Sequence, residues 1–263
     1  MRTGKKAYFI FVLAFFINAI SAYALKPIKA YQATPANYGI EFKENRIPSG
    51  KAVINSWLLL QKDTSVKKAF IICHHDYGNM SFSLPVAYEM YQRGYNVVLF
   101  DYRGFGASSA FEMDSNKLFY PEFVEDFLNV YHFYKDHNRL DMRVYAASMG
   151  TIISTIAYAQ HSDLFKEPFV YDSFIESLSY ILNYIAKLKH RPFNAPINEA
   201  TYQADVDKLK AKSVTFFRGD KDIVAHAANS KLTNRNWKVV SFDGGHLQAP
   251  YLLKKKMFDA ICN

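Results

Sequence analysis

Residues 144–150 read Val-Tyr-Ala-Ala-Ser-Met-Gly, and this stretch decides the fold. The apolar run over 142–147 predicts a buried strand, and the uncharged apolar run over 150–160 predicts a buried helix. Ser148 stands at the turn between them, with a small residue two positions before it and another two positions after it. Small flanks let a sharp turn fit against neighbouring backbone, and the turn lifts the hydroxyl to a helix N-terminus. Ser148 is therefore a candidate nucleophile.

Strand and helix patterns alternate over most of the chain. The predicted strands are 38–47, 52–60, 68–73, 95–100, 142–147, 169–171, 213–217 and 236–242, and the predicted helices are 83–93, 121–135, 150–160 and 250–261. Alternation of this kind requires crossover connections, which favour a parallel sheet with helices on both faces. The turn residues 48–50 join the first two strands as an antiparallel pair. We expect an α/β fold with a mostly parallel eight-stranded sheet.

The segment 173–212 interrupts this alternation. It begins with a helical pattern and ends in a proline-containing loop over 191–196. We interpret it as a small cap inserted over one end of the sheet, because long loops in compact domains usually have a function; a crossover helix with a long loop is the alternative. The apolar side chains of its first helix could line an acyl pocket or pack on the core. These side chains are Phe174, Ile175, Leu178, Tyr180, Ile181 and Tyr184.

A serine nucleophile requires a base and a group that orients the base. His246 follows the last predicted strand in a glycine-rich loop, from which an imidazole can reach across the sheet edge to Ser148. Asp222 follows the strand over 213–217 and is the acid we choose, because a carboxylate fixes the imidazole tautomer and stabilises the imidazolium. Asp172, at the end of the preceding strand, is the alternative acid. Asp220 reads as a turn residue.

The chain order Ser148, Asp222, His246 is that of the α/β-hydrolases, and the sequence resembles this superfamily over nearly all of the mature chain. The branch that it resembles most is the small-cap serine hydrolases described as serine aminopeptidase-like or lysophospholipase-like. Three further segments carry the resemblance. They are His74–Met80, similar to a His-Gly-x-x-Gly-Asn loop, Asp101–Ser108, similar to Asp-x-Arg-Gly-x-Gly-x-Ser, and Gly219–Val224, similar to the acid loop.

The resemblance implies an oxyanion hole made of two backbone N–H groups. One donor is Met149, directly after the nucleophile, and the other is Asp76, with Tyr77 as the alternative. Two positions depart from the family pattern. Ala146 and His75 each stand where glycine is usual, and a histidine tolerates positive φ less well than glycine does. We therefore expect His75 to alter the conformation of this loop.

Other residues of these segments have a structural interpretation. His74 and Asp76 could form a hydrogen-bonded pair that fixes the turn. Arg103 could bind an acidic substrate, but the family pattern makes Asp101 and Arg103 structural, so we assign Arg103 no catalytic role.

The N-terminus has the features of a secretory signal peptide. Basic residues precede an apolar run over 7–20, and Ala22-Tyr23-Ala24 fits the small-x-small cleavage pattern. We expect a signal peptide at 1–24, a hydrolase domain at 25–263, and export to the periplasm or the exterior. An uncleaved membrane anchor is the alternative, because the segment 7–24 is just long enough to span a bilayer.

Composition excludes several classes of protein. The formal net charge is +8, and part of it belongs to the N-terminal segment. The run Lys254-Lys255-Lys256 reads as a solvated turn of the last helix, with a nucleic-acid patch as the alternative. Two cysteines, Cys73 and Cys262, are too few for a disulfide scaffold or a cysteine-based zinc site, and we expect two free thiols.

These observations predict an exported serine hydrolase that cleaves carboxylic esters, including lipid or thioester substrates, through an acyl-enzyme on Ser148. The substrate is a small-molecule ester or acyl compound. We expect no metal, no organic cofactor and no nucleic acid, and contact with a membrane only if the N-terminal segment stays attached. An aminopeptidase or amidase using the same residues is one alternative. A non-catalytic binding protein on the same fold, favoured by His75, is another. The oligomeric state stays open.

Overall fold

The computed structural model describes residues 24–228 and 230–262, so the predicted signal peptide lies outside the described residues apart from Ala24. The strands are β1 (Lys26–Pro27), β2 (Lys43–Ser49), β3 (Ala52–Leu59), β4 (Lys68–Cys73), β5 (Tyr77–Gly78), β6 (Asn96–Phe100), β7 (Asp141–Ala147), β8 (Phe169–Asp172), β9 (Val214–Gly219) and β10 (Trp237–Phe242). The helices are η1 (Pro35–Tyr38), η2 (Met80–Ser83), α2 (Leu84–Gln92), α3 (Pro121–Asn138), α4 (Met149–Gln160), η3 (Ser162–Leu164), α5 (Leu178–Lys189), α6 (Glu199–Leu209), α7 (Ala249–Leu252) and α8 (Lys255–Cys262).

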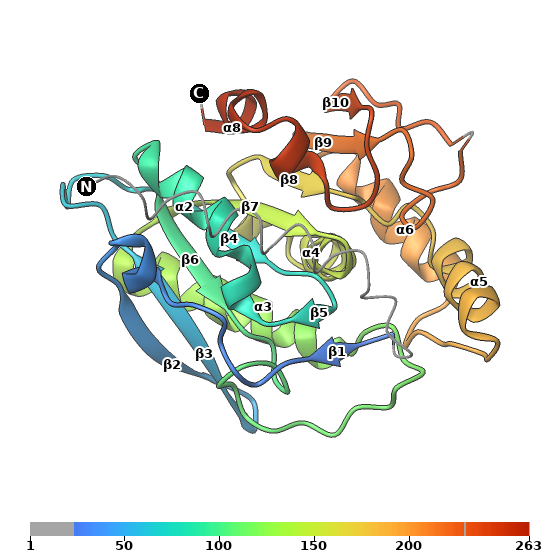
Figure 1. Ribbon diagram of the computed structural model, residues 1–263, viewed down its shortest axis with the longest axis horizontal. Coiled ribbons are helices and arrows are strands. Elements are labelled where there is room, and N and C mark those ends of the chain that lie inside the picture. The colour runs from blue at the N-terminus through green and yellow to red at the C-terminus, as the bar shows by residue number, and fades with distance from the viewer. Residues whose placement is uncertain (1–23, 229, 263) are drawn as a thin grey trace, which may run out of the picture.

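The main sheet has eight strands in the order β10-β9-β8-β7-β4-β6-β3-β2 (Figure 1). β3 pairs antiparallel with both β2 and β6, and the remaining neighbours pair parallel. The predicted α/β fold with an antiparallel start is therefore confirmed. In a parallel sheet the carboxyl ends of the strands meet at one edge, which is where the candidate site residues gather.

Side chains of the central strands alternate between two cores. In β4, Ile71 and Cys73 belong to the core beneath α3, α4 and α6, whereas Phe70 and Ile72 belong to the core beneath α2 and α8. Such strands are covered on both faces, which explains why their sequences read as continuous apolar runs. Both cysteines are free, as the sequence predicted.

Two elements differ from the sequence prediction. The first strand begins at Lys43 rather than residue 38, because residues 35–38 form a 3-10 helix that ends at Gly39 with φ 72°. The predicted last helix is broken at Lys254, which has φ 48°. The chain turns there, so α8 presents Met257 and Phe258 to the core while the lysines stay exposed.

The segment 173–212 contains two helices rather than the one that we predicted. α6 packs against α4 and buries Tyr202, Val206 and Leu209, so it is a crossover helix of the ordinary kind. α5 lies at the periphery of the molecule, beyond the end of the sheet (Figure 1). The sequence signal for α6 is its start, where the Asn198 side chain accepts a hydrogen bond from the Thr201 N–H.

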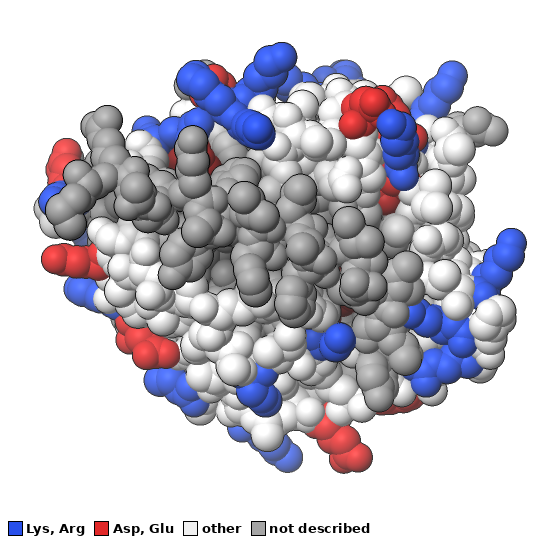
Figure 2. All heavy atoms as spheres, viewed as in Figure 1, with Lys and Arg blue, Asp and Glu red and all other residues white. Residues whose placement is uncertain are grey.

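Charged side chains are spread over the surface. Figure 2 shows Lys and Arg interspersed with Asp and Glu on the described part of one face. Within residues 24–228 and 230–262, no helix combines the length and apolar character needed to cross a bilayer.

Candidate active site

Ser148 occupies the turn between β7 and α4 that the sequence predicts. Its backbone has φ 50° and ψ −116°, and its N–H donates to the Asp172 carbonyl oxygen at 3.1 Å. Gly150 permits this turn, because a Cβ at that position would collide with the carbonyl of Cys73 in β4. The hydroxyl therefore stands at the carboxyl edge of the sheet, at the positive end of α4.

The imidazole of His246 reaches Ser148 from the loop after β10. Its Nε2 lies 2.9 Å from the Ser148 Oγ, and its Nδ1 lies 3.0 Å from each carboxylate oxygen of Asp222. A carboxylate only accepts hydrogen bonds, so Nδ1 carries the hydrogen of the neutral ring and Nε2 accepts from the serine hydroxyl. The structure thus brings together the three residues that the sequence singled out.

Asp222 is held in place by its own loop after β9. The Val224 and Ala225 N–H groups donate to its Oδ1 at 3.1 and 3.0 Å, and its side chain is fully buried. Burial alone would raise the pKa of Asp222, but the charge and hydrogen bonds of His246 lower this pKa to about 2. In turn, burial opposes but the charge of Asp222 and its hydrogen bond raise the pKa of His246.

Asp172, the alternative acid, lies at the end of β8 without a hydrogen bond to the imidazole. Its Oδ2 accepts from the Tyr145 hydroxyl at 3.2 Å, and its Oδ1 has no partner among the described residues. Burial raises the pKa of Asp172 to about 7, even though the charge of His246 opposes the shift. The geometry therefore favours Asp222 over Asp172 as the partner of His246.

The loop after β4 carries the two alternative oxyanion donors. The Tyr77 N–H donates to the Nδ1 of His75 at 3.2 Å, so it is already engaged. This leaves the Asp76 N–H as the better candidate. Met149 is the first residue of α4, so its N–H is one of those that a helix leaves without an intrahelical acceptor.

The backbone of His75 lies outside the left-handed region that favours glycine. It is not among the described non-glycine residues with positive φ. Burial lowers the pKa of His75 to about 3, so the ring is neutral. The predicted hydrogen-bonded pair of His74 and Asp76 is wrong: the His74 Nδ1 contacts the His75 carbonyl oxygen at 2.7 Å, and its Nε2 has no partner among the described residues.

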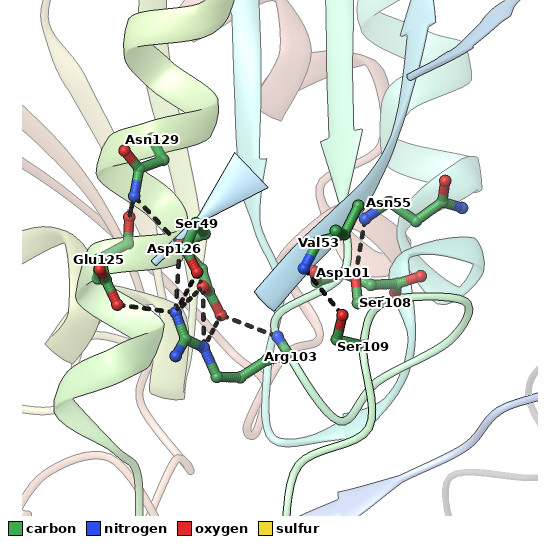
Figure 3. Close-up of polar contacts among 10 residues, drawn as sticks. All are labelled: Ser49, Val53, Asn55, Asp101, Arg103, Ser108, Ser109, Glu125, Asp126 and Asn129. Carbon is green, nitrogen blue, oxygen red and sulfur yellow. Dashed lines mark hydrogen bonds and ion pairs between the residues drawn. The ribbon is translucent and has the colours of Figure 1, made fainter. Parts of the chain in front are cut away.

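Arg103 is part of a buried polar cluster rather than of the site. Its guanidinium contacts both carboxylate oxygens of Asp126 and also Glu125 (Figure 3). The backbone N–H of Arg103 donates to the Asp126 carboxylate at 2.8 Å. Asp126 is fully buried. These contacts tie the loop after β6 to α3, which agrees with the structural interpretation.

The apolar side chains at the start of the segment 173–212 mostly pack on the core. Four of the six that the sequence singled out are buried in it: Phe174, Ile175, Leu178 and Ile181. Tyr180 is half-buried and donates its hydroxyl to the carbonyl of Ile223, which connects α5 with the acid loop. Tyr180 and Tyr184 are the side chains of this set that remain for a substrate.

Ser173 is a site residue that sequence reasoning missed. Its hydroxyl accepts a hydrogen bond at 2.8 Å from the N–H of Leu247, the residue directly after His246. Ser173 and Leu247 both have positive φ. The one available signal was its place after β8, at the same sheet edge as Ser148. Among the described residues, no group of three or more His, Cys, Asp or Glu side chains is arranged to hold a metal ion.

Comparison with known proteins gives the family of this chain and the proteins whose fold it shares. The sequence matches the family model described as serine aminopeptidase S33 over residues 64–236. No curated protein matches the sequence. The fold is similar to that of an esterase from Pyrococcus furiosus, with a TM-score of 0.70, 17% identity, and coverage of 90% of this chain and 97% of that chain.

Two further solved structures share the fold. Est1E from Butyrivibrio proteoclasticus has a TM-score of 0.58 and 18% identity over 77% of this chain and 90% of that one. An esterase from Exiguobacterium antarcticum has a TM-score of 0.58 and 14% identity over 83% of this chain and 97% of that one. Because the family match covers more than half of the sequence, this chain belongs to the serine aminopeptidase S33 family, with an α/β-hydrolase fold.

Proposed function

We propose that this protein is a serine esterase that cleaves carboxylic esters through an acyl-enzyme on Ser148. The observation that carries the proposal is the pair of contacts made by one imidazole: His246 Nε2 with the Ser148 Oγ at 2.9 Å, and Nδ1 with Asp222 at 3.0 Å. This arrangement supports proton transfer from a hydroxyl nucleophile, with the emerging imidazolium stabilised by a buried carboxylate.

The first half of the reaction forms the acyl-enzyme. The Ser148 Oγ bonds to the ester carbonyl carbon while its proton passes to the Nε2 of His246. The tetrahedral intermediate then breaks its bond to the alcohol oxygen, which takes the proton from Nε2 as it leaves. In the second half, a water gives its proton to Nε2 and attacks the acyl carbon. The acid is released as Ser148 recovers its proton.

Charge that develops on the carbonyl oxygen needs donors at a fixed place. We assign this role to the N–H groups of Met149 and Asp76. Losing one donor of an oxyanion hole costs about 3–4 kcal/mol of transition-state stabilisation in comparable enzymes. The Asp76 side chain is half-buried, and this desolvation raises the pKa of its carboxyl.

The class of substrate is supported by the structural neighbours. The proteins from Pyrococcus furiosus and Exiguobacterium antarcticum are esterases, and Est1E is seen with ferulic acid bound. The two half-buried tyrosines of α5, Tyr180 and Tyr184, offer ring surface for an apolar acyl group. The family description favours an aminopeptidase or amidase as the second candidate.

A fluorophosphonate probe tests the nucleophile. It should label the unmodified protein and fail to label a folded Ser148→Ala variant; equal labelling of the two would refute the assignment. p-Nitrophenyl esters of different acyl length, assayed beside aminoacyl amides, then separate the two candidates. Faster turnover of the amides would replace the esterase with the aminopeptidase. A folded protein that neither reacts with the probe nor hydrolyses any substrate would be a binding protein.

We also propose that residues 1–24 are a signal peptide, that residues 25–263 are the exported hydrolase, and that a small cap lies within 173–212. The support for export is the basic, apolar and small-residue pattern of the N-terminus. N-terminal sequencing of protein recovered from the host tests it, and a mature chain that begins at Leu25 is the expected result.

A further inference from the structure

The residues that follow the predicted cleavage position lie across the loop that carries the Asp76 N–H. We call residues 25–32 the N-terminal arm and residues 74–79 the oxyanion loop. β1 in the arm pairs parallel with β5, which is part of this loop (Figure 1). The Lys26 N–H donates to the Asp76 carbonyl at 3.0 Å, and the Ile28 N–H donates to the Gly78 carbonyl at 2.8 Å.

The loop also donates to the arm. The side-chain amide of Asn79 reaches the carbonyl oxygens of Ile28 and Ala30, each at 2.9 Å. Its Oδ1 accepts from the Ser81 N–H, so one buried side chain holds the arm and the start of η2 together. The backbone from the Asp76 carbonyl to Asn79, directly after the Asp76 N–H, is therefore held from the arm.

Tyr31 fastens the other end of the arm. Its hydroxyl donates to the Oδ2 of Asp101 at 2.6 Å and accepts from the Asn55 side-chain amide at 2.9 Å and the Ala107 N–H at 3.0 Å. The Oδ1 of Asp101 accepts from the Met80 N–H at 2.7 Å. Asp101 is fully buried, so the Tyr31 hydroxyl is linked to the end of the oxyanion loop through one carboxylate.

The loop that holds Tyr31 is itself well anchored. The Ser108 hydroxyl donates to the Asp101 carbonyl and accepts from the Asn55 N–H, and the Ser109 hydroxyl accepts from the Val53 N–H (Figure 3). Gly106 makes room for the contact, because a Cβ there would collide with the Asp101 carboxylate. The loop after β6 is thus held in place by these contacts. The arm binds this loop through Tyr31 and binds the oxyanion loop through β1, so it connects the two.

We propose that Tyr31 is a positioning residue that sets the place of the Asp76 N–H through Asp101 and the N-terminal arm; this rests on the proposed function. Cleavage after Ala24 would keep every contact described above, since the first of them is made by Lys26. Small displacements of a donor matter, because rate depends on sub-ångström placement of groups around the transition state.

Tyr31→Phe tests the proposal by removing one hydroxyl from the chain. We expect kcat for a p-nitrophenyl ester to fall about tenfold or more while KM changes by less than about threefold, because the interaction lost is made in the transition state. The affinity of a trifluoromethyl ketone, which forms a tetrahedral adduct with Ser148, should weaken by the same factor as kcat/KM.

Tyr134→Phe is the matched control. The Tyr134 side chain is buried and its hydroxyl is hydrogen-bonded to Ser56 and Asn45, but that hydroxyl makes no hydrogen bond to the described residues of the arm or the loop. It should lose thermal stability and keep kcat within about twofold. If Tyr31→Phe does not fold, Asn79→Ser is the second test variant and should show the same loss of kcat. Serine keeps an oxygen at the start of η2 but lacks the amide that holds the arm.

The outcomes separate this proposal from the proposed function. If the unmodified protein reacts with the fluorophosphonate and Tyr31→Phe keeps its kcat and its ketone affinity, the positioning role is wrong. Equal loss in Tyr134→Phe would show a general effect of stability and would also overturn it. An unmodified protein that does not react with the probe would instead overturn the esterase.

Discussion

The Nδ1 of His246 lies 3.0 Å from both carboxylate oxygens of Asp222, although the two residues stand on loops after different strands. Two further contacts hold those loops against each other: the Asp220 N–H donates to the Phe242 carbonyl and the Lys221 N–H donates to the Gly244 carbonyl. The imidazole is thereby oriented by the packing of two neighbouring strand ends.

Asp222→Asn should reduce kcat by about 10⁴-fold near neutral pH, because an amide can hold the ring in the wrong tautomer and does not stabilise the imidazolium. Steady-state hydrolysis of a p-nitrophenyl ester measures this. Asp172→Asn is the matched control at the same sheet edge and should keep most of the activity, since Asp172 makes no hydrogen bond to His246. A larger loss from Asp172→Asn than from Asp222→Asn would exchange their roles.

The pH dependence of kcat/KM should show an acidic limb above the ordinary histidine pKa of about 6.5. His246 accepts a proton only when it is neutral, and the charge of Asp222 raises the pKa of His246. Activity therefore rises as pH increases through that raised pKa. In Asp222→Asn, the acidic limb of the residual kcat/KM should shift to lower pH, because the charge that raises the pKa of His246 is gone. An acidic limb at the same pH in both proteins would argue against His246 as the group that titrates.

Asp172 should make the protein less stable as pH rises. Burial raises the pKa of Asp172 to about 7, whereas an unfolded carboxyl titrates near about 3.9. Its contribution is fully present below about pH 4 and is lost as pH rises towards about 7, with an upper limit of about 4 kcal/mol.

Urea unfolding at pH 5 and pH 8 measures this dependence. The stability of Asp172→Asn relative to the unmodified protein should increase between these two pH values. Asp243→Asn is the control, because 78% of this side chain is exposed. Its stability relative to the unmodified protein should be the same at pH 5 and pH 8. A difference that does not grow with pH in Asp172→Asn would show that Asp172 is ionised in the fold.

Arg103→Met should destabilise the protein by about 3–5 kcal/mol, because it leaves the fully buried Asp126 carboxylate without its cation. Denaturant unfolding measures the loss. The double variant Arg103→Met/Asp126→Leu should recover much of it, since removing both charges also removes the cost of burying them. The Arg103 guanidinium also donates to Ser49 and to Glu125. A double variant no more stable than Arg103→Met would mean that these other contacts contribute more to stability than the pair with Asp126.

Local signals explain the parts of the site that could be predicted. The turn at Ser148 can be predicted from a short run of residues. A strand pattern, small residues around the serine and a helix pattern follow one another directly. His246 and Asp222 each follow a recognisable strand, and their order along the chain matches one architecture. The parallel sheet then places all strand ends at one edge, so candidates named from separate segments meet there.

Other features had weak signals or none. α6 has three buried residues, Tyr202, Val206 and Leu209, and is otherwise mostly polar. Its sequence therefore shows little of the apolar periodicity that predicts a helix. The break at Lys254 depends on left-handed backbone at a residue type that shows no such preference. The pairing of the N-terminal arm with the oxyanion loop joins segments about fifty positions apart, and no local pattern encodes it.

The sequence by itself determined the alternation of strands and helices, the nucleophile turn and the set of candidate acids, since each follows from patterns within a few residues. Only the tertiary structure favours Asp222 over Asp172 as the partner of His246, and supports our proposal of the Asp76 N–H over that of Tyr77. These choices depend on where two loops lie relative to a third. That placement follows from packing between strands distant in the chain, which no single segment specifies.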